Sequence, residues 1–238
     1  MFALGTIINS LAIIAGGIIG MFFGNKIGDK TQKSLYSVCG VSVLFIGIAG
    51  TMEKMLYVKE GIVASQYALE IVICLALGSV VGELLNIEHK FESFGEWLKV
   101  KSNSMKDSYF VDGFVDATLT VCIGAMAIVG AINDGIYNDS SVLITKSILD
   151  FIIIMVMSAS MGKGTIFSCI PVFIFQGSMT LLARFLAPIF SLGALNNISL
   201  IGSILIFCVG LNLVWGKKVS VANMLPSLII AILFSYLA

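Results

Sequence analysis

Residues 144–161 read ITKSILDFIIIMVMSASM, and this stretch decides the class of fold. Only Lys146 and Asp150 are charged within it. As a helix rising about 1.5 Å per residue, the stretch comes close to the roughly 30 Å thickness of a bilayer's hydrocarbon core. The pattern therefore predicts a membrane-spanning helix that carries one charge of each sign.

The whole chain shares this apolar character. Of its 238 residues, 58% are hydrophobic and 12% are charged, and the mean hydropathy is +1.03. Soluble domains have about 25% charged residues, so the polar side chains here are too few to cover a globule in water. The composition excludes a soluble enzyme, a disordered region and a secreted disulfide scaffold. Because 14 basic residues balance 14 acidic ones, nothing indicates a nucleic-acid partner.

The apolar segments predict an all-α polytopic membrane protein, with residues 1–238 as a single transmembrane helical domain in contact with the lipid bilayer. Eight spans are expected, each long enough to cross the hydrocarbon core. Their expected positions are about 2–24, 34–52, 66–87, 111–132, 144–161, 166–188, 199–215 and 221–238.

The basic residues predict the orientation of these spans. Ten lysines lie in the connections after spans one, three, five and seven, against three basic residues in the other connections. Basic loops stay in the cytoplasm, so the first set of connections is expected inside and both termini outside. In the longest loop, Phe91, Phe94 and Leu98 recur at helical spacing, which predicts an amphipathic helix over about 88–103 on the cytoplasmic interface.

Small residues recur every four positions, as in Gly16–Gly20–Gly24 and Gly78–Gly82. Such rows let helix backbones approach closely, either within one chain or across a homo-oligomer, and both arrangements remain open at this point. Residues 34–47 and 199–210 also share a small-residue pattern in opposite inferred orientations. This pattern indicates either a weak inverted repeat of spans one to three against six to eight, typical of transporters, or a chance likeness between glycine-rich helices.

Polar groups inside apolar spans are candidates for function. A charge at the membrane centre costs about 2.5–3.5 kcal/mol on insertion scales. Lys146 and Asp150, four residues apart, share a helix face and can pair. A predicted ion- or solute-binding group comprises Asn9, Asn133, Asp134, Lys146 and Asp150 at similar depth in the outer half of the bundle, together with Gln176 near the middle of its span. A buried ion pair beside a capping turn is the alternative interpretation.

A second set of polar residues predicts a route from this group towards the inner face. It comprises Ser158, Ser160, Asn212 and Asn223. Each residue alone is more often structural, but outer, middle and inner polar positions together are typical of a pathway.

Catalytic and cofactor chemistry has little support. The five cysteines lie in separate apolar stretches without a CxxC pair, and His89 is the single histidine. These residues predict neither a metal site nor a disulfide framework. The segment Gly162–Lys163–Gly164–Thr165 lacks the glycine spacing and the Ser or Thr after lysine that a phosphate-binding loop needs. We therefore expect no catalytic residues, no metal, no cofactor and no enzymatic activity.

Several motifs in order resemble one known family. They are Gly5–Thr6–x–x–Asn9, Gly130–Ala131–Ile132–Asn133–Asp134–Gly135, Lys146–Ser147–x–x–Asp150–Phe151 and Asn223–Met224–Leu225–Pro226. Together they resemble the domain of unknown function 554 family of YqgA/YdfK-like membrane proteins. The resemblance runs from Met1 to the C-terminus, and it implies a multi-pass protein of the bacterial inner membrane without established substrate or catalytic residues.

Two functions are consistent with these features. The first is a small transporter or channel for an ion or small polar solute, with the polar group in the outer half of the bundle as its site. The second is a non-transporting membrane scaffold or sensor that acts through helix packing and the amphipathic segment 88–110.

Overall fold

The protein is described here from a computed structural model that places residues 3–24, 26, 28–122, 125–186 and 190–236. Parts of the predicted spans lie outside these residues, namely residue 2 of the first span, residues 123–124 of the fourth, 187–188 of the sixth and 237–238 of the eighth.

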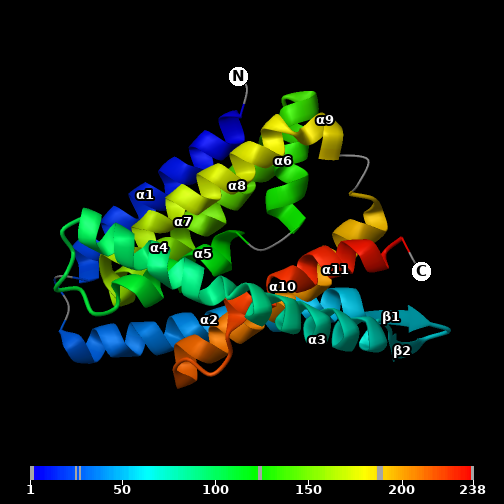
Figure 1. Ribbon diagram of the computed structural model, residues 1–238, viewed down its shortest axis with the longest axis horizontal. Helices are drawn as coiled ribbons and strands as arrows, with labels where there is room; N and C mark the ends of the chain where they lie inside the picture. The colour runs from blue at the N-terminus through cyan, green and yellow to red at the C-terminus, as the bar shows by residue number, and fades with distance from the viewer. Residues whose placement is uncertain (1–2, 25, 27, 123–124, 187–189, 237–238) are drawn as a thin grey trace.

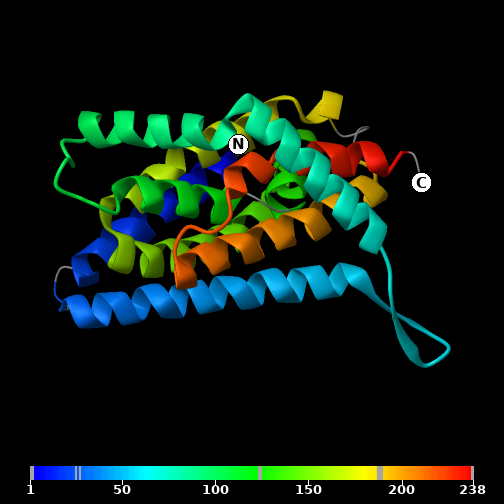
Figure 2. The same cartoon turned by 60° about the horizontal axis from the view of Figure 1, so that its bottom comes forward.

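The described chain is a helical bundle with one short hairpin (Figures 1 and 2). Its α-helices are α1 Leu4–Gly24, α2 Asp29–Met55, α3 Ala68–Leu85, α4 Ile87–Lys101, α5 Phe110–Cys122, α6 Ala125–Tyr137, α7 Ser141–Met161, α8 Cys169–Leu181, α9 Ala183–Leu186, α10 Leu192–Trp215 and α11 Pro226–Phe234. Two 3₁₀ segments, η1 Gly162–Ser168 and η3 Val221–Met224, precede α8 and α11.

The glycine row of α1 packs α1 against α7. A Cβ added to Gly24 would lie 2.6 Å from the carbonyl oxygen of Ala159, and Gly16 and Gly20 abut the carbonyls of Phe151 and Met155 in the same way. Positions rise by four on both helices, so α1 and α7 run parallel. The expected close approach through small residues is confirmed, and it occurs within one chain.

Other helix pairs pack antiparallel. Gly40 of α2 meets Leu213 of α10, while Gly50 of α2 meets Ser203. Helix α3 is likewise antiparallel to the η3–α11 segment, because Gly78 meets Ser227 of α11 and Gly82 meets Asn223 of η3. These contacts also cover the glycine rows of α1 and α3 inside the protomer. Of the two arrangements that the sequence leaves open, the described residues show packing within one chain for these rows.

The chain reverses direction between α7 and α8. Gly17 of α1 lies against Ile166 of η1, and Asn9 of α1 hydrogen-bonds to Gln176 of α8, so α8 runs antiparallel to α1 and to α7. The turn begins at Gly162, whose φ of 79° is open to glycine but strained for other residues. Pro171, near the start of α8, has no backbone N–H to extend the helix backwards.

These packing relations define two ends of the bundle. Asp134 at the end of α6 contacts Gly5 at the start of α1, so α6 ends where α1 begins. We call this the first end. At the other end, which we call the second end, Gly24 meets Ala159 of α7 and Gly164 of η1 meets Phe110 of α5. In Figure 1, α1 runs from the N-terminus towards the second end at lower left, and α7 and α8 lie beside it.

The number of long spans differs from the sequence-based expectation. Five helical segments are long and apolar enough to cross a membrane: Leu4–Gly24, Ser37–Met55, Ala68–Leu85, Ser141–Leu181 and Leu192–Trp215. The bent pair α5–α6, with 62° between its halves, would make a sixth. Eight regular spans are not found among the described residues. The predicted spans 166–188 and 221–238 fail as continuous helices because 3₁₀ turns and prolines leave α8 with 13 residues and α11 with 9.

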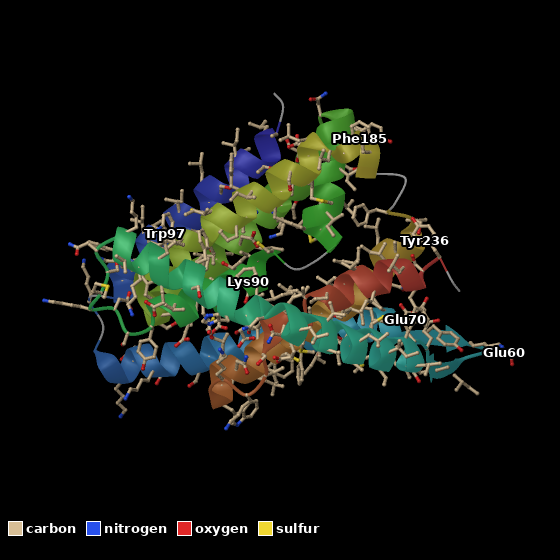
Figure 3. All side chains as sticks on the ribbon, viewed as in Figure 1. Glu60, Glu70, Lys90, Trp97, Phe185 and Tyr236 are labelled. Atoms are coloured by element: carbon tan, nitrogen blue, oxygen red, sulfur yellow. The ribbon has the colours of Figure 1, made fainter. Side chains whose placement is uncertain are left out.

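The all-α expectation also needs a small correction, since a β-hairpin follows α2. Strands β1 Leu56–Lys59 and β2 Ile62–Ser65 pair antiparallel, with Leu56 opposite Ser65. Glu60 and Gly61 form the turn with φ of 53° and 80°, a combination that matches the twist of a two-residue hairpin. Figure 3 shows Glu60 at the tip, projecting from the bundle.

The helix predicted over 88–103 exists as α4. Its apolar face is covered by the start of α5: Leu98 is buried with Phe110 and Phe114, and the ring of Phe94 lies edge-on to Phe114. Trp97 is 56% exposed and stacks on Phe94. Trp97 lies near the second end in Figure 3. The helix is confirmed, whereas its place at a membrane interface stays a prediction.

Candidate functional site

A buried ion pair lies in the first half of α7. Lys146 and Asp150 are 6% and 3% exposed, and their side chains pair as the four-residue spacing predicts. The Lys146 ammonium also donates to the carbonyl oxygen of Val121, at 2.8 Å. This carbonyl belongs to the last turn of α5, where the helix dipole is negative and favours a cation.

The first two turns of α1 bring three polar side chains to the same region. Thr6 and Asn9 are fully buried, and Ser10 is 8% exposed. The Asn9 side-chain amide donates to Oε1 of Gln176 on α8 at 3.2 Å, and Asn9 also hydrogen-bonds to Asp150. Asn9 therefore joins α1, α7 and α8 at one point in the bundle.

Asp134 enters from the last turn of α6. Its Oδ2 accepts a 3.0 Å hydrogen bond from the backbone N–H of Gly5, which is one of the free N–H groups at the start of α1. The carboxylate is fully buried, and the positive end of the α1 dipole stabilises its charge. Two carboxylates, one ammonium and two carboxamides thus come from four helices. We refer to Thr6, Asn9, Asp134, Lys146, Asp150 and Gln176 as the outer polar cluster.

Several atoms of the outer polar cluster lack partners among the described residues. Asn9 Oδ1, Asp134 Oδ1, Gln176 Nε2 and Thr6 Oγ1 are buried without a hydrogen bond, and so are Ser10 Oγ and Thr180 Oγ1 beside them. Each buried unsatisfied group costs about 1–3 kcal/mol. Because most of these atoms are oxygens, the arrangement is suited to ordered water or a small hydrated cation.

The structure does not join every predicted residue to this cluster. Asn133 is half-buried, its backbone carbonyl accepts from the N–H of Asp139, and its side chain forms no hydrogen bond with the cluster among the described residues. Thr6 and Thr180 were missing from the predicted site. The helical spacing of Thr6 from Asn9, and of Thr180 from Gln176, was the signal that could have found them.

The predicted inner route is mostly engaged in backbone contacts. Ser158 donates to the carbonyl of Gly17 at 2.8 Å, which joins α7 to α1, and Ser160 donates to Met157 within its own helix. Asn212 closes the turn after α10 by bonding the backbone of Lys218 and Val219. Asn223 accepts from the N–H of Glu88 at 2.8 Å and so starts α4. These side chains hold turns and helix contacts in place.

A separate pocket of about 230 Å³ lies towards the second end. Its lining includes Glu88 and Glu92 of α4, Asp112 and Asp116 of α5, and Lys217 after α10. Asp112 and Asp116 lie in the first two turns of α5. Their convergence with α4 depends on the fold of the long loop, which sequence spacing alone does not reveal.

The described residues hold no group of three or more His, Cys, Asp or Glu side chains arranged to bind a metal ion. An apolar pocket of about 320 Å³, lined by Leu119, Phe175, Ile198 and Leu228 among others, separates the α5–α8 side from α10 and α11. Its lining has few polar groups that could bind a charged solute. The polar chemistry of the described chain is therefore concentrated in the outer polar cluster and in the pocket at the second end.

Comparison with known proteins gives one family. The profile described as "Protein of unknown function (DUF554)" matches residues 4–236. The uncharacterized membrane protein YdfK of Bacillus subtilis (strain 168) is 30% identical over 226 residues, which cover 95% of this chain and 93% of that protein. The uncharacterized protein YqgA of Escherichia coli (strain K12) is 28% identical over 232 residues, with 96% and 94% covered. No solved structure matches the chain.

Proposed function

The chain belongs to the DUF554 family, and we propose that this multi-pass membrane protein moves a small ion or polar solute across the bacterial cytoplasmic membrane. One observation carries the proposal. Polar side chains of four helices are buried together in an apolar bundle with several atoms unpaired. Intramembrane charges are costly, and they typically mark ion or proton routes. We propose no enzymatic step.

We propose that the chain nevertheless crosses the membrane eight times, and the reversal of chain direction at η1 makes this number consistent with the helix lengths. The segment Ser141–Leu181 contains two legs, because α7 runs parallel and α8 antiparallel to α1. The bent pair α5–α6 and the short η3–α11 segment provide two further legs. Broken helices of this kind are tolerated at membrane depth where they are buried in protein.

Helix pairing supports the inverted repeat as well. Spans one to three correspond to α1, α2 and α3, and spans six to eight to α8, α10 and α11. Each proposed counterpart pair, α1–α8, α2–α10 and α3–α11, is in antiparallel contact. A two-fold axis in the membrane plane would relate helices in this way.

The orientation follows from the lysines. Lys26, Lys163 and Lys217 all lie near the second end, beside the finish of α1, α7 and α10. We therefore place the second end in the cytoplasm and the outer polar cluster nearer the external face, with both chain termini outside.

The residues of the outer polar cluster have distinct proposed roles. Asp150 holds the cation or proton, and Lys146 controls its charge state by pairing with it. Asn9 and Gln176 orient solute through their carboxamides, and Asp134 supplies a second carboxylate at the start of α1. These roles match the donors and acceptors that each side chain offers.

Flux through purified protein in liposomes tests the proposal. We expect wild-type vesicles to pass at least one of protons, alkali cations, halides or small organic acids under an imposed gradient. Asp150→Asn should reduce this flux to the level of empty liposomes, because it keeps the shape of the side chain and removes its charge.

Asp139→Asn is the matched control. Asp139 is exposed in the turn before α7, and hydrogen bonds from Ser141 lower its pKa, so it is ionised at neutral pH. This variant also removes one carboxylate near the first end, yet it should leave flux unchanged. Wild-type flux that survives Asp150→Asn would reject the site. The scaffold or sensor function would be favoured if none of the tested ions and solutes crosses wild-type vesicles and if the protein instead loses its function when Phe94 and Trp97 are made polar.

A further inference from the structure

The pocket at the second end is built from three segments far apart in the sequence. Glu88 and Glu92 come from the first turns of α4, Asp112 and Asp116 from the first turns of α5, and Lys217 from the turn after α10. The pocket encloses about 230 Å³, several times the roughly 30 Å³ that a water molecule occupies in the liquid. It has room for a small organic molecule, and it lies apart from the outer polar cluster.

The charges of this pocket do not balance. Its lining has four carboxylates and one ammonium, an excess of three formal negative charges. Lys217 lies 2.7 Å from Glu88 Oε1 and also pairs with Glu92. Burial lowers the pKa of Lys217, but the hydrogen bonds from its ammonium to Glu88 and Glu92 outweigh this effect and raise the pKa, so the side chain stays cationic.

The acids on α5 have no such partner. In the part of the chain that the structure describes, neither Asp112 nor Asp116 forms an ion pair. The ion pairs of Lys217 go to Glu88 and Glu92 instead. Glu88 is 7% exposed, and its second oxygen, Oε2, is buried without a hydrogen bond. Lys217 thus offsets one of the two formal negative charges on the α4 wall of the pocket, and the α5 wall has no ion-pair partner among the described residues.

The Lys217 contacts indicate the kind of ligand that fits. A primary ammonium on a flexible alkyl chain already lies between two of the carboxylates. The acids do not form a group arranged to hold a metal ion. We propose that the pocket binds a short aliphatic diamine or polyamine, with one ammonium paired to Asp112 and Asp116 and another to Glu88 and Glu92, where Lys217 is the tethered counterion in the absence of ligand. This site is independent of the transport proposal.

The exposure of Lys217 allows its side chain to leave the pocket. Its side chain is 55% exposed, whereas that of Glu88 is 10% exposed. An ammonium of the ligand can therefore replace that of Lys217 while Lys217 turns to solvent. Lys217→Met should then tighten binding, because it removes the competitor and leaves Glu88 and Glu92 for the ligand.

Calorimetric titration of the full-length protein in detergent tests this site. The probes are 1,4-diaminobutane and spermidine, compared with 1,4-butanediol and MgCl₂ at matched ionic strength. We expect the amines to bind and the diol and Mg²⁺ not to bind. Glu92→Gln and Asp116→Asn should each weaken amine binding by about tenfold, the effect of losing a charged hydrogen bond. Glu96→Gln, one turn further along α4 and exposed, should leave it unchanged.

A folding defect cannot produce this whole set of results. Lys217→Met is expected to bind diamine more tightly than the wild type and to be stabilised by diamine more than the wild type is. Equal binding of Mg²⁺, unchanged amine affinity in Asp116→Asn, or weaker amine binding in Lys217→Met would overturn the proposal.

Discussion

Lys146 and Asp150 are two charges that an apolar helix can hold only together. Removing both from water costs free energy, which their attraction, the Val121 carbonyl and Asn9 offset. A buried pair of this kind contributes little net stability, yet losing one partner is expensive because the other stays buried. The pair is therefore costly to break although it adds little to the stability of the fold.

A mutant cycle tests the coupling. Lys146→Met or Asp150→Leu alone should lower the free energy of unfolding by about 3–5 kcal/mol, since each leaves an uncompensated charge. The double change should be milder than either single change. Thermal unfolding in detergent measures all four proteins, and strictly additive effects would mean that the two side chains are not coupled.

The sequence predicts this pair well and its surroundings less well. Spacing of four on one helix places Lys146 beside Asp150 whatever the rest of the fold does. Asn9, Asp134 and Gln176 could be ranked by their depth in the spans, but their convergence depends on how α1, α6 and α8 pack. The pocket that joins Glu92, Asp116 and Lys217 depends on three connections, and no local pattern encodes it.

At the scale of elements, α1 and α7 are joined by a row of glycines against a row of carbonyls. Gly16, Gly20 and Gly24 leave no room for a Cβ, because backbone of α7 occupies that space. Lipid tails are as apolar as the side chains, so close packing of this kind holds membrane helices together. The same contact sets the height of Asn9 relative to Asp150 and so positions the site.

Gly20→Ala should separate α1 from α7. The new methyl group would overlap the carbonyl of Met155, and overpacking typically costs about 1–3 kcal/mol. Gly177→Ala on α8 is the matched control, because its Cβ would meet nothing closer than Thr6 Cγ2 at 4.0 Å. Thermal unfolding in detergent should show a clear loss for the first variant and none for the second. Equal stabilities would contradict the packing described here.

Helix type was predictable along most of the chain, but helix continuity was not. The apolar runs of α1, α3 and α7 continue as single helices, and no proline interrupts them. The runs over 166–188 and 221–238 are just as apolar, yet Pro171 and Pro226 with nearby small residues divide them into 3₁₀ turns and short helices. Hydropathy measures the preference of a segment for lipid, and it does not detect such breaks in a helix.

At the scale of the whole molecule, two groups of helices diverge from the second end in Figure 1, one with α1, α7 and α8 and one with α2, α3 and α10. Trp97 and Phe185 lie towards opposite ends in Figure 3. The outer polar cluster belongs to the first group, and the pocket at the second end lies where α4 and α5 meet the end of α10.

The arrangement predicts which positions a membrane-impermeant thiol reagent reaches. In a cysteine-free background, single cysteines at Asn138 and Leu192 should be labelled from outside intact cells, since both positions are exposed near the first end. Cysteines at Lys30 and Lys218 should react only after the membrane is opened. External labelling at Lys30, or internal labelling at Asn138, would contradict eight crossings with both termini outside.

The central claim is that the outer polar cluster is a hydrated or ion-occupied site within the membrane. An experimental density map of the protein in lipid, detailed enough to show ordered water, tests it most directly. We predict density within hydrogen-bonding distance of Asn9 Oδ1 and Asp134 Oδ1, two of the buried oxygens that have no hydrogen-bond partner among the described residues. A map in which these oxygens pair directly with neighbouring side chains, with no density between them, would contradict the account.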